Sequence, residues 1–305
     1  VTMTADVSDA AGNAAAQVTS SAFTYDKTAP TVTLVSSNKS DGTYKASDII
    51  PIAVLFSEDV TVDTSSGTPT ITLSTGGSGS SVNFTSGSGT TLLTFNYTVA
   101  SGHNSNDLAY SASNSLALNS ATIKDSAGND ATLTLPSPSE AASLSFNKDI
   151  VIDTTSPTMT ITSSTSGVSD GSTTKDATIS LTFTSSEATT NFTDADITVI
   201  NGAISGFNPA SSTTYTATFT PTTDGATTVD VAGNVFTDAV GNNNTAATQF
   251  NWTYDSTPPI ISAIGTGAFS WGAVLNATED NSNGTVSVTT SGAEDGQTVT
   301  ITLNG

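Results

Sequence analysis

Cysteine is absent from this chain of 305 residues and basic residues are scarce, and each deficit excludes a class of protein. Without cysteine, neither a disulfide nor a cysteine-ligated metal site holds the fold. Six lysines and arginines stand against 27 aspartates and glutamates, which gives a formal net charge of −21. Binding to nucleic acid depends on neutralising phosphates, so this balance argues against a nucleic-acid partner. Anionic membrane surfaces are disfavoured for the same reason.

Long apolar runs and the common enzyme motifs are also missing. No run reaches the ~20 apolar residues that cross a bilayer, so no membrane insertion is expected. His103 is the single histidine, and we interpret it as a solvated loop residue rather than a catalytic base. No nucleophile elbow, phosphate-binding glycine loop or His-Glu-x-x-His motif occurs. Paired carboxylates for sugar hydrolysis stay open because their separation is spatial, but the prediction is that the chain is not an enzyme.

The residues that are abundant favour an all-β fold. Threonine and valine suit the half-buried surface of a pleated strand. Clusters of glycine, serine and asparagine between the alternating runs supply turns, and no window of ten residues reads as an amphipathic helix. The run from Leu144 to Ile152, for example, is predicted to be a strand.

A short motif, Asp-x-Thr-x-Pro, occurs three times, and each copy follows a predicted strand. The copies begin at Asp26, Asp153 and Asp255, which we call the first, second and third joints. They lie 127 and 102 residues apart (153 − 26 and 255 − 153), a normal size for one β-sandwich. We therefore predict tandem immunoglobulin-like β-sandwiches in an elongated array. The predicted domains are the end of a preceding repeat (1–26), two complete repeats (27–153 and 154–255) and the start of a following repeat (256–305).

Acidic residues recur at similar distances from these joints. A Ser-Glu pair follows the first joint at Glu58 and the second at Glu187, 32 and 34 residues downstream. Turns of the Asp-x-x-Gly-Asn type begin at Asp9, Asp125 and Asp238. The first and third of these turns begin 17 residues before the next joint, and the second begins 28 residues before it, because a proline-containing loop is inserted there.

Calcium is the ion that such a set of residues suits. Ca²⁺ takes six to eight oxygens from carboxylates, amides and carbonyls, and a sandwich presents its loops in clusters at its two ends. We predict that at each joint the turn of one unit faces the joint and the Ser-Glu loop of the next unit. The predicted ligands are Asp9, Asn13, Asp26 and Glu58 at the first joint, Asp125, Asn129, Asp153 and Glu187 at the second, and Asp238, Asn242 and Asp255 at the third. Each turn alone is also a good β-turn with no metal, but three copies in phase with a joint favour the ion.

Taken together, the joints, the Ser-Glu pairs, the Asp-x-x-Gly-Asn turns and the late run Gly292–Thr300 resemble bacterial immunoglobulin-like repeats of giant secreted or cell-surface proteins. The resemblance implies an exported tandem array, often found in calcium-dependent adhesins where such repeats act as a stalk. The expected function is then that of non-catalytic extracellular extender repeats, located outside the cell or on its surface. The expected partners are the neighbouring Ig-like repeats of the same chain.

Two alternatives stay open. The chain could be a subunit of a self-assembling filament, sheath or S-layer, which would add other copies of itself as partners. It could also be a carbohydrate-binding module, which needs a patch of exposed aromatic side chains. The aromatic residues before the joints, Tyr25, Trp252 and Tyr254, are expected to fill the ends of the cores rather than bind sugar.

Overall fold

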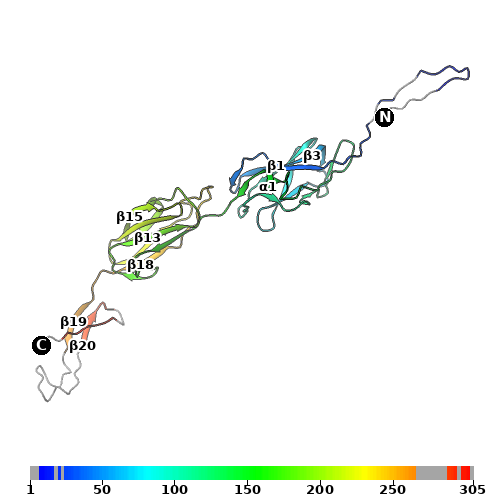
Figure 1. Ribbon diagram of the computed structural model, residues 1–305. Coiled ribbons are helices and arrows are strands. Elements are labelled where there is room, and N and C mark those ends of the chain that lie inside the picture. The colour runs from blue at the N-terminus through cyan, green and yellow to red at the C-terminus, as the bar shows by residue number, and fades with distance from the viewer. Residues whose placement is uncertain (1–6, 17–19, 22–23, 266–286, 294–296, 303–305) are drawn as a thin grey trace, which may run out of the picture. The chain divides into compact units, whose positions relative to one another are not determined.

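A computed structural model describes residues 7–16, 20–21, 24–265, 287–293 and 297–302 (Figure 1). Its regular structure is almost entirely β, which confirms the predicted all-β fold. The chain divides into unit 1, Val1–Ser156 with Ala239–Asn242, and unit 2, Pro157–Asp238 with Asn243–Gly305. Within the described ranges no helix has the length and apolar character needed to cross a membrane.

Unit 1 builds one apolar core from an eight-stranded sheet and a separate two-stranded sheet. Its elements are β1 (Val32–Ser37), β2 (Gly42–Tyr44), β3 (Ile49–Asp63), β4 (Thr70–Ser74), β5 (Ser80–Ser86), β6 (Thr90–Thr98), β7 (Ala109–Tyr110), β8 (Leu116–Ala117), β9 (Thr122–Lys124), the helix α1 (Leu144–Asn147) and β10 (Ile150–Ile152). The sheet order is β1-β3-β6-β5-β4-β7, with β8 on β4 and β9 on β3, while β10 pairs with β2 in parallel. Alternate residues of the long strand β3, from Ile50 to Phe56, are buried, as expected for a strand with one face on the core.

One predicted strand of unit 1 is wrong over two thirds of its length. The run 144–152 begins with the helical turn α1, and only its last three residues form a strand, β10. The Ser143 hydroxyl accepts a hydrogen bond from the Phe146 amide at 3.3 Å and so caps the turn. The alternation of apolar residues gave a wrong prediction here because Leu144 reaches the core from a helical turn, while the neighbouring Phe146 stays exposed.

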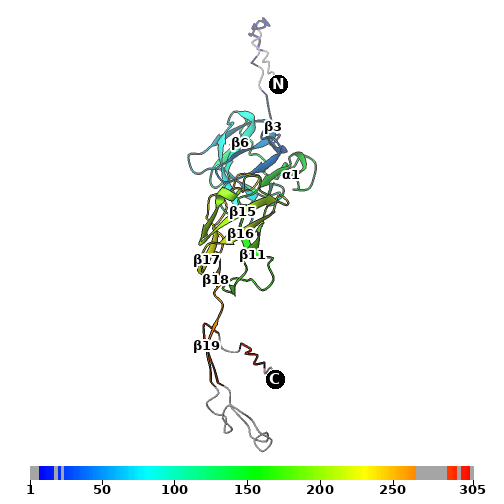
Figure 2. The same ribbon diagram turned by 90° about the vertical axis from the view of Figure 1, so that its left-hand side faces the viewer.

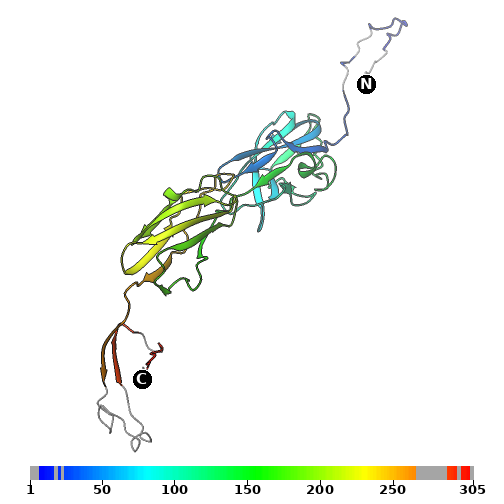
Figure 3. The ribbon, with the colours of Figure 1, turned by 60° about the vertical axis from the view of Figure 1, so that its left-hand side comes forward.

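Unit 2 is a sandwich of two four-stranded sheets. Its elements are β11 (Met159–Ser163), β12 (Thr173–Thr174), β13 (Ile179–Ser185), the 3₁₀ turn η1 (Asp194–Asp196), β14 (Ile197–Ile200), β15 (Gly202–Pro209), β16 (Thr214–Pro221), β17 (Gly225–Val231), β18 (Phe250–Tyr254), β19 (Ile260–Gly265) and β20 (Ser287–Ser291). The sheets have the orders β11-β13-β16-β15 and β12-β18-β17-β14. Figure 2 shows β15 beside β16, and Figure 3 shows the long strands of this unit running side by side. The pair β19–β20 forms a separate hairpin.

The core of unit 2 is rich in aromatic rings. Trp252 is 2% exposed and meets Phe219 edge to face, with ring centroids 4.7 Å apart. The prediction that Trp252 fills a core is therefore confirmed. The same prediction is wrong for Tyr25, which is 72% exposed and lies under the Lys27 ammonium at 4.9 Å from its ring centroid.

The two units share a strand plan. The antiparallel run β1-β3-β6-β5 of unit 1 corresponds in order and direction to β11-β13-β16-β15 of unit 2. The parallel pair β2–β10 likewise corresponds to β12–β18. At these pairs Asp41 accepts a hydrogen bond from the Asp149 amide, and Asp170 accepts one from the Asn251 amide. The internal repetition seen in the sequence is thus a repetition of structure.

Candidate functional site

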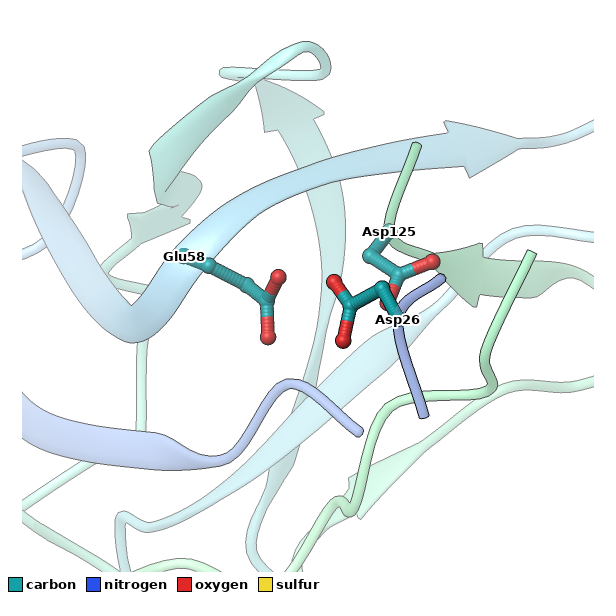
Figure 4. A group of neighbouring side chains, drawn as sticks. All are labelled: Asp26, Glu58 and Asp125. Atoms are coloured by element: carbon teal, nitrogen blue, oxygen red, sulfur yellow. The ribbon is translucent and has the colours of Figure 1, made fainter. Parts of the chain in front are cut away.

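Three carboxylates of unit 1 converge at one end of its sheet (Figure 4). One oxygen from each of Asp26, Glu58 and Asp125 lies within 4.8 Å of the other two. Glu58 belongs to β3, Asp125 directly follows β9, and Asp26 lies on the chain that enters the unit at the first joint. Strand β9 pairs with the far half of β3, Thr61 opposite Lys124, and this ladder brings the Asp125 turn beside Glu58. We call this group the acidic triad.

The joint motif folds into the same turn each time. The Asp26 Oδ1 accepts a hydrogen bond from the amide of Thr28 at 2.9 Å. The Asp153 Oδ1 and the Asp255 Oδ1 accept the amides of Thr155 and Thr257 at the same distance. This Asx turn explains the Asp-x-Thr spacing of the motif. In the first joint it holds Asp26 so that a carboxylate oxygen faces the other two acids.

The Asp-x-x-Gly-Asn turn of unit 1 is closed by its asparagine. The Asp125 Oδ1 accepts the backbone amide of Asn129 at 2.8 Å, and its Oδ2 accepts the Asn129 side-chain amide at 2.7 Å. The same side-chain nitrogen donates to the carbonyl oxygens of Asp26 and Thr28 at 3.4 and 3.3 Å. Because the nitrogen of Asn129 is the atom directed at the joint, this residue positions the triad instead of offering it an oxygen.

The electrostatics of the triad leave it short of positive charge. Burial, and then the neighbouring charges of Asp26 and Asp125, raise the pKa of Glu58. Burial alone would also raise the pKa of Asp125, but the hydrogen bonds from the Asn129 side chain and from the amides of the turn outweigh it, so that this pKa is lowered. The ion pairs of Lys124 with Asp130 and of Lys148 with Asp41 do not include a triad member. The triad is a cluster of carboxylates that a cation would stabilise.

The structure corrects how the predicted ligands are grouped. The turn at Asp125 was expected to face the second joint, and it faces the first joint instead. The reason is the pairing of β9 with β3, which folds the end of unit 1 back toward its own entry. Asp153 lies elsewhere in the unit, after β10, where its amide donates to the carbonyl of Tyr44.

The remaining predicted ligands lie outside the acidic triad. Asp9 and Asn13 close their own turn, with the Asn13 side chain donating to Asp9 Oδ2 at 2.9 Å. In unit 1, the Asn242 side chain donates to the carbonyl of Asp153 at 3.1 Å, as Asn129 does to Asp26. In unit 2, the half-buried Glu187 and the buried Asp238 each have a carboxylate oxygen within 4.8 Å of the other, although the sequence assigned them to different joints, and Asp255 is exposed.

Two residues that hydrogen-bond to the joint at the end of their unit were not predicted from the sequence. In unit 2, Asp224 Oδ1 accepts hydrogen bonds from the amide and the hydroxyl of Ser256, both at 2.8 Å, and its Oδ2 accepts the Thr257 hydroxyl at 2.5 Å. In unit 1, Asn104 Oδ1 accepts the amide of Thr154 at 2.8 Å. Both acceptors sit in loops with no repeated motif around them, so spacing alone carried no signal for them.

The single histidine is also better anchored than expected. His103 is half-buried, its ring stacks on Tyr97 with centroids 5.9 Å apart, and its Nδ1 lies 2.8 Å from the Tyr97 hydroxyl. The carbonyl of His103 accepts the Thr154 hydroxyl at 3.0 Å. Its interpretation as a solvated loop residue was wrong, because the loop packs between the core and the second joint.

Comparison with known families identifies one of the two units. Residues 153–254 match the family model described as a bacterial Ig-like domain. This stretch is a bacterial Ig-like domain. The bacterial Ig-like domain spans both four-stranded sheets of unit 2, from β11 to β18. Members of this family are typically non-catalytic.

Comparison with solved structures and with curated proteins adds little beyond the bacterial Ig-like domain. The chain is similar to InvD of Yersinia pseudotuberculosis, at 15% identity over 76% of this chain and 62% of that one, with a TM-score of 0.28. It is also similar to domains 4–9 of the surface layer protein SbsC, at 14% identity over 88% of this chain and 37% of that one, with a TM-score of 0.22. The chain thus spans less than two thirds of either structure. No curated protein matches the sequence.

Proposed function

We propose that this chain is a non-catalytic structural segment of a larger surface or secreted protein, in which Ig-like units extend the molecule and Ca²⁺ stiffens the joints. Its proposed location is extracellular or on the cell surface, where bacterial Ig-like domains are typically found. The observation that carries the proposal is the acidic triad, because one of its three carboxylates belongs to the joint and the other two belong to the sandwich.

A cation bound to the triad would connect the incoming chain to unit 1. Asp26 precedes the first strand of the unit and is attached to it in part through the Asn129 amide. An ion shared by Asp26, Glu58 and Asp125 would add a charged link between the joint, strand β3 and the turn after β9. Carboxylates with backbone or water oxygens are the ligands that Ca²⁺ prefers. The proposed ligands of this site are the three acids, with Asn129 in a positioning role.

We expect the proposed site to bind Ca²⁺ with moderate affinity. Extracellular calcium modules assembled from loops bind at about 10⁻⁴–10⁻³ M. At a calcium concentration ten times the dissociation constant, binding to the folded state alone stabilises it by about 1.4 kcal/mol. For a unit of this size that corresponds to a rise in melting temperature of about 3–6 °C. Calcium at the other joints stays a prediction from the sequence, which offers Asp153 and Glu187 as ligands at the second joint and Asp238, Asn242 and Asp255 at the third.

The first prediction concerns removal of one triad charge. Asp26→Asn keeps an oxygen for the Asx turn to the Thr28 amide but removes the carboxylate, so calcium should no longer raise the melting temperature of unit 1. The measurement is differential scanning calorimetry with calcium and with EDTA. The matched control is Asp63→Asn, since Asp63 makes the same turn with the Ser65 amide at 2.9 Å in the same unit. Asp63→Asn should retain the full effect of calcium, and an unchanged response in Asp26→Asn would remove calcium from the proposal.

A further inference from the structure

The edge of strand β1 in unit 1 is covered by the loop of residues 136–149, which we call the covering loop. The Val35 amide donates to the carbonyl of Ala142 at 2.8 Å, and the helical turn α1 lies against β1 (Figure 1). The Leu144 side chain is fully buried in the core. The Lys148 Nζ lies 3.7 Å from the Asp41 Oδ1. The covering loop therefore supplies this edge with a carbonyl, an apolar side chain and a positive charge.

Unit 2 has the same edge without a covering loop. From the Asp-x-x-Gly-Asn turn to the next joint the chain takes 17 residues in unit 2 and 28 in unit 1. Strand β11 corresponds to β1, and Ile161 in β11 corresponds to Val35 in β1. Each of these two residues lies opposite the position three residues before a serine whose hydroxyl accepts the amide just ahead of the strand.

The Ile161 amide has no hydrogen-bond partner within the described ranges. The Ser164 amide donates to the Ser180 carbonyl, and the register of β11 on β13 has no shift, so the even-numbered residues of β11 are the ones bonded to β13. Ile161 lies between them and directs its amide away from β13, as Val35 does from β3 in unit 1. The edge that is covered in unit 1 is therefore open in unit 2.

A cavity of about 160 Å³ lies beside this open edge. It is lined by the buried apolar side chains of Met159, Ile161 and Phe250 and by polar residues that include Asp170 and Thr248. Cavities of roughly 150 Å³ hold one benzene-sized apolar group. The cavity thus suits one side chain of the size of leucine.

Asp170 is the counterpart of Asp41, but it has no cation beside it. Lys148 directly precedes the residue whose amide bonds to Asp41, and the residue at that place in unit 2 is Phe250. Phe250 is buried, so unit 2 closes its core without a covering loop. In the part of the chain that the structure describes, no lysine forms an ion pair with Asp170. A basic group that reaches the cavity would meet an exposed carboxylate free to pair with it.

We propose that the β11 edge of unit 2 binds a peptide segment of another protein, one that carries a leucine-sized side chain with a lysine or arginine close to it in sequence. A carbonyl of the segment accepts the Ile161 amide, the apolar side chain enters the cavity, and the basic group pairs with Asp170. These are the three groups that unit 1 supplies to its own equivalent edge. A basic segment also suits a chain with a net charge of −21. Addition of a peptide to a sheet edge, with a pocket that selects one side chain, is a common mode of recognition.

The test uses a synthetic peptide of residues 138–148 of this chain, which contains Ala142, Leu144 and Lys148. The readout is the methyl signal of Met159 in NMR spectra of the 305-residue chain in EDTA, so that the outcome does not depend on the proposed calcium sites. The chain has two methionines, and Met3→Leu leaves Met159 as the single one. The Met159 signal should shift and saturate with a dissociation constant in the low millimolar range, since one buried side chain must offset the cost of association.

Variants of the peptide and of the protein separate the three contacts. Leu144→Ser in the peptide should weaken binding by about tenfold or more, the loss expected for one buried leucine side chain. Asp170→Asn keeps the oxygen that accepts the Asn251 amide and should weaken binding severalfold, with no further loss when Lys148→Gln is added in the peptide. Thr248→Trp places a ring at the cavity and should abolish binding.

The matched control is Thr253→Trp, an exposed position of β18 outside the cavity, which should bind the peptide like the unmodified chain. Circular dichroism of each protein variant confirms that the fold is retained. A Met159 signal that does not move at a peptide concentration of about 10 mM would overturn the proposal. Equal binding of the Leu144→Ser peptide would do so too, as would equal binding by Thr248→Trp and Thr253→Trp.

Discussion

At the scale of single residues, the substitution Glu58→Gln should change the melting temperature of unit 1 differently in EDTA and in calcium. The raised pKa of Glu58 shows that the folded unit disfavours its charge, mainly through burial and then through Asp26 and Asp125. Glu58→Gln removes that repulsion and should raise the melting temperature of unit 1 in EDTA. The same change removes a proposed ligand and should abolish the increase that calcium produces. Calorimetry in both solutions checks the sign of each effect, and a variant destabilised in EDTA would contradict the repulsion argument.

Tyr97 provides a second prediction at this scale, for alkaline pH. Burial raises its pKa to about 12, as it does for Tyr110. Since the folded pKa exceeds the ordinary value of about 10, the folded state favours the protonated phenol. This contribution is complete below about pH 10 and is lost as the pH rises toward 12. Tyr97→Phe should therefore make the stability of unit 1 less sensitive to pH in that range.

Phenolate absorbance measured against pH tests this assignment. Tyr97 and Tyr110 should ionise only as unit 1 unfolds. Ionisation of Tyr97 and Tyr110 near pH 10, with the circular dichroism of the fold unchanged, would show that these two buried phenols are not protected.

At the scale of elements, the loop between β16 and β17 should hold the third joint without metal. Asp224 receives three hydrogen bonds from Ser256 and Thr257, and these bonds lower its pKa, the one from the Thr257 side chain most. Asp224→Ala should accelerate hydrogen exchange of the Ser256 amide by about tenfold, the loss expected for a hydrogen bond to a charged acceptor. Asp224→Asn keeps an acceptor oxygen and should fall between. Hydrogen exchange read by mass spectrometry in EDTA gives the comparison, and equal rates in all three proteins would refute the role of Asp224.

The elements also show how far the sequence could lead. Alternation of apolar residues predicted most of the strands, and the repeated Asp-x-Thr-x-Pro motif predicted short joints between strands, each of which the structure closes with an Asx turn. Spacing along the chain also selected Asp26, Glu58 and Asp125, but it assigned Asp125 to the wrong joint. The partner of Asp125 is decided by the pairing of β9 with β3, a contact between residues about 60 positions apart that leaves no local pattern. Asp224 was not predicted from the sequence for the same reason.

At the scale of the whole molecule, the described residues form two apolar cores that share no residue. One core is centred on residues such as Phe95 in unit 1, and the other on Phe183 and Trp252 in unit 2. Because each core is complete in itself, cooperative unfolding should be confined to one unit at a time when calcium is absent. The equilibrium unfolding of the chain should then show two transitions instead of one.

Core truncations in each unit make this separation measurable. Phe95→Ala and Phe183→Ala each remove a fully buried ring and should cost about 3–5 kcal/mol in the unit that contains it. Fluorescence of Trp252, recorded in EDTA with Trp271 replaced by phenylalanine, follows unit 2 alone. Phe183→Ala should lower the midpoint of that signal, whereas Phe95→Ala should leave it in place and lower the other calorimetric transition. If Phe95→Ala moved the Trp252 signal by the same amount, the two cores would be unfolding as one, and a chain of independent sandwiches joined by short linkers would be the wrong description.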